Sequence, residues 1–447
     1  MNDQMGDPVV PNRLVQTLLL SSVLLLGLGG ICQTKTQAES PNSDCNLHPS
    51  ATFTAHGHSV LSSPTFIATD NSSPSLTRRV YVDGRVTALA FSPDGGTIAV
   101  GGDSLAILLL DAATGRTIRS IPFFSDDELA LLDASPVTGE RVVRDVAYSP
   151  DAKVLAVGHS TGLVKLFDTH SGQLKSSLDD VRRERADGQP LHDYLRLPLA
   201  HEDVSRVAFS RDGVWIATCG QTIDYRRDRV RRLGAGPTAG LLKLWRADSG
   251  KLQRDLDGEH NQQVMDVAFS PGDQYLASVG NWRNAREAGS GVKLWNLQNL
   301  QVASKLVPPE SQQQGATPLC MGLSADATKI ALGSFVQTRR TGESRGWIQI
   351  FDIDSGTVQT NWLVDRPVRS VAFTADNKSV AALSGKCECR LWNPATGQTQ
   401  AVLQSVGNPA DTSWTAFALS PKDDVIVIGG RNSQPRNFLY WWKLNRG

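Results

Sequence analysis

Histidine and cysteine, two residue types that often catalyse reactions or bind metals, are few in this sequence, and neither stands in a recognisable catalytic motif. Among its 447 residues are eight histidines and six cysteines. We find no HExxH zinc site, no CxxCH haem site, no GxSxG nucleophile elbow and no GxxxxGKS or GxxxxGKT phosphate loop. His56-Gly57-His58 could in principle bind a metal, but it lies in a polar stretch and we interpret it as solvated. We therefore expect a non-catalytic protein with no metal and no cofactor.

The cysteines show no spacing typical of a disulfide framework or a zinc site. They stand at positions 32, 45, 219, 320, 387 and 389. Cys219 and Cys320 fall at inward-facing positions of expected strands, where a free cysteine usually behaves as a small apolar residue. Cysteine usage therefore indicates neither an oxidising nor a reducing compartment.

The chemistry that the sequence does concentrate is that of arginine beside aromatic rings. Three segments, 220–239, 280–290 and 334–346, contain ten arginines against four acidic residues. Guanidinium groups match carboxylate and phosphate geometry, and arginine with aromatics is typical of interface centres. We predict that the following residues bind a partner: Arg226, Arg227, Arg231, Arg232, Arg283, Arg340, Tyr225, Trp282 and Trp347. Alternatively, the arginines of the first segment pair with acidic residues such as Asp126, Asp127 and Glu128, or stay solvated.

The elements that must position these segments are given by a pattern repeated seven times. The copies begin at Val86, Val143, Val204, Val264, Leu319, Val368 and Trp414. Each begins with an alternating apolar run, continues through a polar turn such as Ser-Pro-Asp-Gly, and resumes as a second apolar run. Alternation with a period of two predicts strands with one buried face, and the turn residues predict a hairpin. In six copies an alanine follows the first branched residue of the second run, as expected where sheets approach closely.

A third run in each copy ends in a characteristic pair of residues. The pairs are Leu110-Asp111, Phe167-Asp168, Trp245-Arg246, Trp295-Asn296, Phe351-Asp352, Trp392-Asn393 and Trp442-Lys443. With the Ser-Pro-Asp-Gly turns, these pairs resemble the WD-repeat family. The resemblance covers residues 76–447 and implies an all-β, seven-bladed propeller of four-stranded blades.

The resemblance also implies a polar network inside each blade, made by a histidine, a Ser or Thr of the second strand and the third-strand tryptophan. Two copies keep these three members, which are His201, Thr218 and Trp245, then His260, Ser278 and Trp295. The aspartate that completes the family's network has no counterpart in either, because an insertion occupies its turn. We therefore expect the blades to depend more on apolar packing than on this network.

In WD-repeat propellers the second-to-third-strand connections share a face with the connections between blades. The three arginine-rich segments are such connections in blades three, four and five, so the resemblance places them in one sector of one face. The long connection at 179–203 also lies on that face and mixes both charge signs. Binding residues usually sit on loops of a rigid scaffold, which supports this sector as the partner site.

Closure of the ring can also be predicted. The last copy has three strands, and a spare strand, Thr77 to Asp83, precedes the first copy. We expect this strand to pair with the last blade, which would remove the exposed edges and fasten the ring.

The N-terminal region reads differently from the repeats. Residues 14–31 form the one long apolar run of the sequence, of a length typical of a signal sequence or a marginal membrane span. We predict an export signal or anchor at 1–38 and a disordered, Ser/Thr/Pro-rich linker at 39–75. Cleavage before Glu39, retention as an anchor or lipidation at Cys32, and an apolar leader without an export role all remain open.

We conclude from the sequence that the protein is a binding scaffold for other proteins, recognising an acidic or phosphorylated segment, exported or tethered to a membrane by 14–31. Nucleic acid is the weaker partner, because 45 basic and 45 acidic residues cancel. A membrane contact is expected through the N-terminal segment alone. The alternatives are an enzyme that uses the central pocket of the propeller and a cytoplasmic assembly scaffold.

Overall fold

The chain divides into two units, Met1–Phe66 and Ile67–Gly447, and every residue described below belongs to the second. The structure, a computed structural model, describes residues 74–133, 140–178, 201–223, 237–256, 260, 262–283, 288–308, 316–337, 343–385, 388–404, 412–422, 424–432 and 437–444. The predicted leader, the linker up to residue 73 and His56-Gly57-His58 lie outside this part of the chain.

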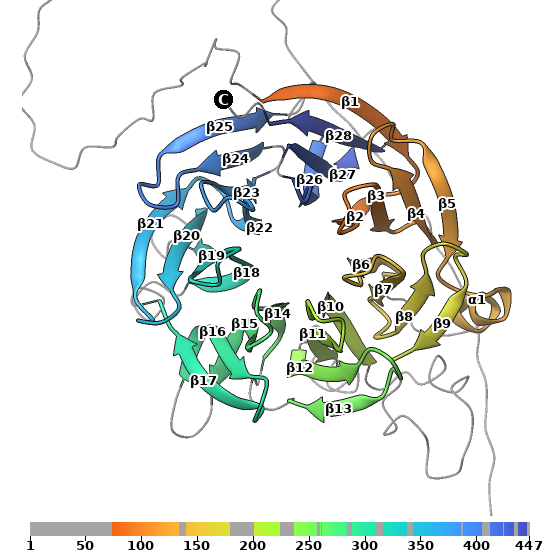
Figure 1. The fold of residues 1–447 in the computed structure, drawn as a ribbon, viewed down its shortest axis with the longest axis horizontal. Helices are drawn as coiled ribbons and strands as arrows, with labels where there is room; N and C mark the ends of the chain where they lie inside the picture. The colour runs from red at the N-terminus through yellow and green to blue at the C-terminus, as the bar shows by residue number, and fades with distance from the viewer. Residues whose placement is uncertain are drawn as a thin grey trace, which may run out of the picture. The chain divides into compact units, whose positions relative to one another are not determined.

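Seven four-stranded antiparallel sheets stand around a central axis, each with its first strand innermost (Figure 1). The predicted seven-bladed propeller is therefore confirmed. Blade one consists of β2 (Val86–Phe91), β3 (Thr97–Gly102), β4 (Ala106–Asp111) and β5 (Thr117–Pro122). Blade two consists of β6 (Val143–Tyr148), β7 (Val154–His159), β8 (Val164–Asp168) and β9 (Leu174–Ser177). Blade three consists of β10 (His201–Phe209), β11 (Trp215–Ile223), β12 (Pro237–Arg246) and β13 (Leu252–Asp255).

The remaining blades repeat the same order of strands. Blade four consists of β14 (Val264–Phe269), β15 (Tyr275–Arg283), β16 (Ala288–Asn296) and β17 (Gln301–Leu306). Blade five consists of β18 (Thr317–Leu323), β19 (Lys329–Gln337), β20 (Ser344–Asp352) and β21 (Val358–Val364). Blade six consists of β22 (Val368–Phe373), β23 (Val380–Ser384), β24 (Glu388–Trp392) and β25 (Thr399–Gln404). Blade seven consists of β26 (Thr412–Leu419), β27 (Val425–Asn432), β28 (Asn437–Lys443) and β1 (Ser75–Val82).

The ring is closed by the N-terminal strand, as the sequence predicted. β1 pairs with β28 in antiparallel register, from Ser75 opposite Lys443 to Val82 opposite Asn437. The closure also fastens blade seven to blade one, because the indole N–H of Trp441 donates to the carbonyl of Ala112 at 3.1 Å. β1 thus belongs to the sheet of blade seven while the chain continues from it into blade one, and the Trp441–Ala112 bond adds a contact between the two blades.

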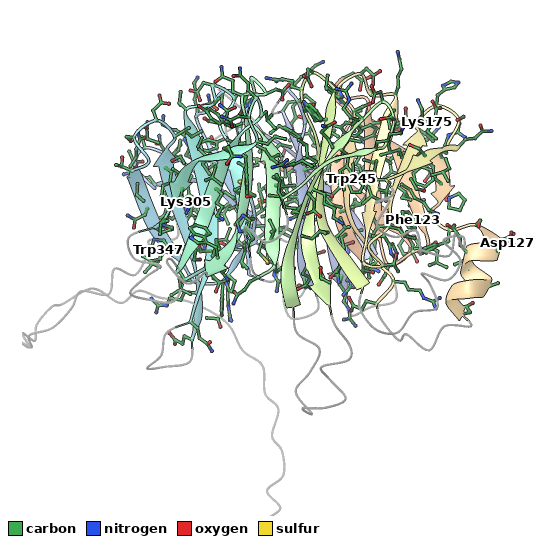
Figure 2. The ribbon with its side chains drawn as sticks, turned by 90° about the horizontal axis from the view of Figure 1, so that it is seen from below. Phe123, Asp127, Lys175, Trp245, Lys305 and Trp347 are labelled. Atoms are coloured by element: carbon green, nitrogen blue, oxygen red, sulfur yellow. The ribbon has the colours of Figure 1, made fainter. Side chains whose placement is uncertain are left out.

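The strand ends form two different faces of the ring. Because neighbouring strands run antiparallel, the first-to-second and third-to-fourth connections lie at one end, here called the turn face. The second-to-third connections and the connections between blades lie at the other end, here called the loop face. In Figure 2 Lys175 lies toward the turn face, whereas Trp347 and Asp127 lie toward the loop face.

The polar turns between first and second strands are held by one recurring set of hydrogen bonds. In blade two, Ser149 Oγ donates to Asp151 Oδ1 at 2.6 Å and accepts from Val154 N at 2.9 Å. The hydroxyl bond and the bond from the Lys153 backbone N–H hold the pKa of Asp151 below its usual value. The same pair of side chains recurs as Ser92–Asp94, Ser210–Asp212, Ser324–Asp326 and Thr374–Asp376. This bonding explains why the Ser-Pro-Asp-Gly sequence forms a tight hairpin turn.

Packing between blades uses small residues, as the repeated alanines predicted. Ala99, Ala156 and Ala217 of the second strands are completely buried. Beside them, a Cβ on Gly158 would lie 2.8 Å from Cγ1 of Val204, the valine that begins the next repeat. Branched residues of one blade therefore fit against small residues of its neighbour, which brings the sheets close together.

One helix stands among the strands of the described part of the chain. It is α1 (Asp126–Asp133), in the connection between blades one and two. Within those residues we find no helix with the length and apolar character needed to cross a membrane.

Candidate partner-binding face

The sector predicted to bind a partner is built on three hairpins that continue past the body of the ring. In blade two, pairing of the second and third strands stops at Gly158 opposite Val164. In blade three it continues to Ile223 opposite Pro237, in blade four to Arg283 opposite Ala288, and in blade five to Gln337 opposite Ser344. Three adjacent blades therefore extend their central hairpins on the loop face, with unbroken register in blades four and five and a register shift between Thr222 and Ile223 in blade three.

Trp282, predicted to contact a partner, is instead buried at the base of the blade-four hairpin. Its side chain is 3% exposed and meets the ring of His260 edge-on at 6.0 Å. A Cβ on Gly289 of the opposite strand would lie 2.5 Å from Cε2 of this indole. The interface role expected for Trp282 does not fit this burial, because its surface is already used to support the hairpin.

Trp347 is buried in the same way in blade five. It is 5% exposed, clusters with Ala316 and Val336, and donates its indole N–H to Asn361 Oδ1 at 3.2 Å. The sequence placed both tryptophans correctly beside the arginine-rich segments. It did not show that each indole packs inward against its own blade.

Most of the predicted arginines lie outside the residues that the structure describes. Tyr225, Arg226, Arg227, Arg231, Arg232 and Arg340 fall outside the described residues. The backbone of Arg283 ends β15, opposite Ala288, and its side chain is not described. The loop face therefore presents the hairpin bases, while the contacts of these arginine side chains stay a prediction.

Other arginines occupy the loop-face ends of blades five to seven. Arg345 of β20 is about half exposed and pairs with Glu343 at 3.4 Å. Arg366 in the connection between blades five and six, Arg369 in β22 and Arg431 in β27 are exposed. Arg345 is one of the ten arginines of the three segments, whereas the sequence analysis did not single out Arg366, Arg369 and Arg431, because each of them stands alone in the sequence.

The acidic residues offered as an alternative partner for the arginines belong to α1. Ser125 caps this helix, since Glu128 N donates to Ser125 Oγ and Ser125 N donates to a Glu128 carboxylate oxygen. Lys165 of β8 reaches Glu128 with Nζ 2.7 Å from Oε2 and also donates to the Phe123 carbonyl. Burial alone would raise the pKa of Glu128, but these bonds more than offset it and the pKa is lower than usual. Glu128 is therefore already paired with a lysine.

The residues expected to lock blade four form a continuous hydrogen-bonded chain. Trp295 Nε1 donates to Ser278 Oγ at 2.9 Å, and Ser278 Oγ lies 2.9 Å from His260 Nε2. Burial and the nearby charge of Lys293 lower the pKa of His260 to about 3, so the imidazole is neutral and can accept from the serine. His260 acts in the structure of the blade and not as a proton donor.

Blade three shows the same lock in shorter form. Trp245 Nε1 donates to Thr218 Oγ1 at 2.9 Å. His201 begins β10 opposite Ile223, and its side chain falls outside the described set. The insertion that replaces the family's turn aspartate thus leaves an indole–hydroxyl bond inside each of these two blades.

The wall of the central channel carries a charge cluster that sequence reasoning missed. Arg206 of β10 lies 3.9 Å from Asp145 of β6 and 3.5 Å from Asp266 of β14. Each carboxylate also accepts from the next blade, Asp145 from Val207 N at 3.0 Å and Asp266 from Met321 N at 2.8 Å. Burial raises the pKa of Asp145 to about 6, although Arg206 opposes the shift. Every member is bonded across blades, which is typical of a structural clasp.

Among the described residues, no three histidine, cysteine or acidic side chains are arranged to hold a metal ion. Cys219, Cys320 and Cys389 are free thiols in the core. Burial raises the pKa of Cys320 above its usual value, which leaves it protonated and unreactive. The prediction that Cys219 and Cys320 are small buried residues is confirmed.

Comparison with known proteins agrees with the repeats. A family described as WD domain, G-beta repeat matches residues 75–108, 192–224 and 250–296. A second, described as anaphase-promoting complex subunit 4 WD40 domain, matches residues 130–186. These matches fall on the blades whose sheets are described above. The chain is a WD-repeat β-propeller protein.

Three curated relatives resemble this WD-repeat protein over parts of their length. WD repeat-containing protein SL1-17 of Schistosoma mansoni is 26% identical over 157 residues, 35% of this chain and 45% of the relative. Apoptotic protease-activating factor 1 of Rattus norvegicus is 20% identical over 365 residues, 72% of this chain and 27% of the relative. Telomerase protein component 1 of Rattus norvegicus is 24% identical over 388 residues, 80% of this chain and 12% of the relative. The chain spans less than half of each.

The dipeptides that mark the WD repeats have a clear structural role. Asp168, after Phe167, accepts from the backbone N–H of Ser171 at 2.7 Å and from its hydroxyl at 2.9 Å. Asp352 makes the same two bonds with Ser355. These aspartates fix the turn between the third and fourth strands, and the bonds hold the pKa of each below its usual value.

Proposed function

We propose that this WD-repeat protein is a non-catalytic scaffold that binds a partner protein through the loop face of blades three, four and five. The observation that carries the proposal is the extension of three adjacent hairpins on one face, each supported at its base by antiparallel strand pairing. Buried Trp282 and Trp347 stiffen two of the hairpins, which lowers the cost of ordering a binding surface. WD40 propellers in general bind other proteins, which supports the same conclusion.

The partner segment that fits this face is acidic or phosphorylated. The hairpins lead into segments with ten arginines and four acidic residues, and Arg366, Arg369 and Arg431 add exposed positive charge on the same face. A guanidinium binds carboxylate or phosphate oxygens through two parallel hydrogen bonds, which gives both affinity and orientation. Pairing of the arginines with Glu128 is disfavoured, because Glu128 is already bonded to Lys165; exposed Asp126 and Asp127 stay the alternative partners on α1.

The test exchanges six predicted arginines for serine: Arg226, Arg227, Arg231, Arg232, Arg283 and Arg340. Removing a central arginine from an interface costs about 2 kcal/mol or more, so loss of the whole set should abolish capture of partners from a lysate. The control exchanges six exposed cations away from the loop face, Arg116, Lys251, Arg254, Lys378, Lys422 and Lys443, which changes the net charge equally. Both variants should keep the wild-type melting temperature. Equal recovery of the same partners by both, with the same salt dependence, would refute the proposal.

We further infer that residues 14–31 export or tether the protein. The inference rests on their apolar run, which has the length of a signal sequence or a marginal membrane span. The test is cell fractionation with N-terminal sequencing of the mature protein; full-length protein entirely in the soluble cytoplasm would favour the cytoplasmic scaffold instead.

An enzyme that uses the central channel is the second candidate. Its support would be the buried carboxyl of Asp145, whose pKa is raised, since groups with shifted pKa values gather at functional sites. Its bonds to Arg206 and to Val207 account for that carboxyl without a substrate. Hydrolytic assays and metal analysis of the purified protein distinguish the two, because the scaffold requires neither activity nor metal.

A further inference from the structure

At two junctions on the turn face, neighbouring turns are bridged by the residue in the left-handed position of the first-to-second-strand turn. In blade four this residue is Asp273, with a φ of 51°, and its carboxylate accepts from Arg211 N at 2.9 Å and Asp212 N at 2.7 Å of blade three. In blade six it is Asn377, with a φ of 58°, which accepts from Ala325 N of blade five at 2.8 Å. Asp and Asn thus reach back and close the junction to the preceding blade.

The junction between blades two and three has no such bridge. Its left-handed residue is Gly213, with a φ of 73°; Gly95 of blade one, Ala152 of blade two and Ala327 of blade five likewise carry no side chain that could reach back. A Cβ on Gly213 would lie 3.7 Å from Cδ of Pro150, so a side chain there would stand between the two turns.

The residue that ends the first strand also affects the polarity of each junction. Between blades one and two, the hydroxyl of Tyr148 lies 3.0 Å from Thr97 Oγ1. The corresponding residues one blade further are Phe209 and Val154, which cannot form a hydrogen bond; the first strands of the remaining blades also end in Phe or Leu. Phe209 and Val154 therefore present apolar surface between blades two and three.

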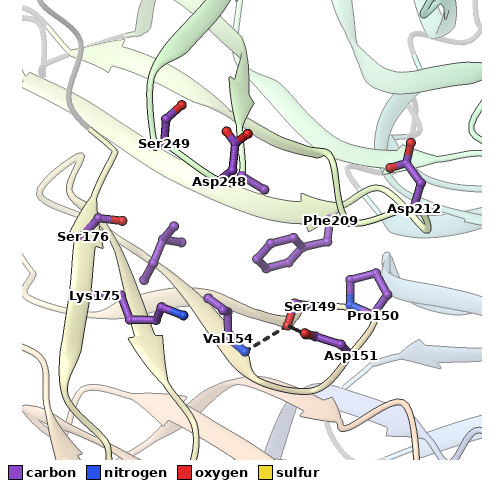
Figure 3. Close-up of a pocket in the computed structure, with 13 residues that line it drawn as sticks. Ser149, Pro150, Asp151, Val154, Lys175, Ser176, Phe209, Asp212, Asp248 and Ser249 are labelled. Carbon is purple, nitrogen blue, oxygen red and sulfur yellow. Dashed lines mark hydrogen bonds between the residues drawn. The ribbon is translucent and has the colours of Figure 1, made fainter.

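A groove of about 470 Å³ opens at this junction, within the range of ligand pockets. Figure 3 shows the Phe209 ring in the middle of the groove, with Lys175 and Ser176 on one side and Pro150 and Asp212 on the other. Val154 and Leu166 add to its apolar floor. The floor suits an apolar side chain or the aliphatic stem of a long one.

Three carboxylates and the ammonium group of Lys175 lie along the groove. Asp151 and Asp212 come from the neighbouring first turns of blades two and three, and Asp248 comes from the third-to-fourth turn of blade three. Asp151 and Asp248 are already paired with Lys153 and Arg246, at 3.7 Å and 2.9 Å. Asp212 accepts through Oδ1, from Ser210 Oγ at 2.5 Å and Val214 N at 2.9 Å, and among the described residues we find no hydrogen bond to its Oδ2, which can therefore accept from a ligand.

A groove at the junction of blades five and six provides a comparison of opposite charge. It has a volume of about 370 Å³ and is lined by Lys329, Lys378 and the amides of Gln359, Asn377, Asn393 and Gln400, with no carboxylate among its lining residues. The same architecture thus carries two lysines without a carboxylate at one junction, and three aspartates with one lysine, Lys175, over a phenylalanine at the other. Because Asp151 and Asp248 are already paired, Asp212 is the carboxylate that favours a cation of the occupant.

We propose that the groove between blades two and three is a second docking site, on the face opposite the proposed partner site, for an extended peptide that presents an arginine or lysine beside an apolar residue. The cation pairs with Asp212. The apolar side chain covers Phe209 and Val154. The protein then binds two partners at once, one on each face.

The probe is a short fluorescein-labelled peptide in which arginine alternates with leucine, titrated with the full chain in an anisotropy assay. Two control peptides replace arginine with glutamate or leucine with glycine. We expect saturable binding of the arginine–leucine peptide, at least tenfold weaker binding of the arginine–glycine peptide and none of the glutamate–leucine peptide. Absence of saturable binding up to millimolar protein, or equal binding of all three peptides, would overturn the proposal.

The decisive variant is Gly213→Asn, because asparagine tolerates the left-handed backbone and its side chain would stand against Pro150, between the two turns that border the groove. It should weaken binding at least tenfold. The matched control is Gly95→Asn, the same change in the same turn of blade one, where a Cβ would lie 3.5 Å from Pro421; it should change affinity less than twofold. Equal affinity of the two variants would contradict the site.

Two further variants keep the test independent of folding defects and of the loop face. Asp212→Asn retains the turn but removes the charge, so binding should weaken several-fold and lose part of its salt dependence. The six-arginine variant of the loop face should bind the peptide as the wild type does. If it also fails to bind, the peptide interacts with the wrong face and the groove proposal is wrong, whatever becomes of the proposed partner site.

Discussion

Lys165 Nζ lies 2.8 Å from Oε1 and 2.7 Å from Oε2 of Glu128, so a nearly buried lysine of blade two holds the helix that connects it to blade one. The lysine is 5% exposed and the glutamate 26%. Phe123 supplies a further contact through its ring, 5.0 Å from the ammonium. This pair explains how a connection of mainly acidic residues is kept against an apolar blade edge.

Glu128→Gln should destabilise the protein by about 2 kcal/mol, because it leaves the charge of Lys165 buried without a counter-charge. Lys165→Met should cost less, since it removes the charge together with its need for a partner. Urea unfolding measures both. Asp127→Asn, which changes an exposed carboxylate of the same helix, is the control and should have no measurable effect. A smaller loss for Glu128→Gln than for Lys165→Met would contradict this account.

Ser278→Ala should cost about 2 kcal/mol, more than Thr218→Val at about 1 kcal/mol. Removing Ser278 Oγ deprives both Trp295 and His260 of a partner, whereas removing Thr218 Oγ1 deprives Trp245 alone among the residues whose side chains are described. Chemical unfolding of Ser278→Ala, of Trp295→Phe and of the double variant gives the coupling free energy between Ser278 and Trp295. Additive losses in the double variant would show that the indole bond carries no stability.

The fold was predictable from the sequence because its signals are local and repeated. The Ser–Asp turns, the alternating runs and the spare strand before Val86 each specify a hairpin or an edge through neighbouring residues. The side-chain environment at the site was less accessible. Trp282 faces inward because Gly289 and His260 leave space for it, and neither is a local signal.

Other misses have comparable physical reasons. Lys165 pairs with a residue 37 positions away, and a buried lysine cannot be identified without its partner. The sequence analysis did not predict the helix α1. Ser125 and Glu128 have the spacing of a capping box, which is a sequence signal for the start of a helix. The Asp145–Arg206–Asp266 cluster joins three blades and becomes visible when the ring closes.

Gly158→Ala should destabilise the ring by about 1–3 kcal/mol, because its Cβ would lie 2.8 Å from Val204 Cγ1 at the tight junction between blades two and three. Gly272→Ala is the matched control. A Cβ there has no atom within 4 Å, so it should leave stability unchanged. Thermal unfolding compares them, and equal melting temperatures would show that the junction yields easily.

Removal of residues 1–84 should lower the melting temperature strongly, whereas removal of residues 1–72 should not. The longer deletion removes β1 and exposes the edge of β28. It also removes the cation–π contact of Arg79 with the ring of Phe438, at 3.9 Å. Differential scanning calorimetry of the two truncations tests the closure. Identical transitions would mean that β1 adds nothing to the cooperativity of the ring.

The stability of the ring should depend on pH through Asp145. Its pKa rises from 3.8 to about 6 because burial disfavours the charged form, with Asp266 adding repulsion and Arg206 attraction. A pKa raised by folding means that the folded state binds the proton more tightly than the unfolded chain. The contribution of Asp145 is therefore fully present below about pH 4 and is lost as the pH rises through about 6, up to about 3 kcal/mol.

Asp145→Asn removes this titration, because the amide oxygen can still accept from Val207 N while position 145 no longer ionises. Burial also raises the pKa of Asp266, but Asp266 is present in both proteins. Between about pH 5 and 7.5, the unfolding free energy of the wild type should fall relative to that of the variant, chiefly near the pKa of Asp145. Carboxylates with lowered pKa, such as Asp94 and Asp326, act at lower pH and equally in both proteins. Urea titrations at several pH values measure the difference. A constant difference across this range would show that Asp145 remains ionised in the folded ring and that Arg206 outweighs its burial.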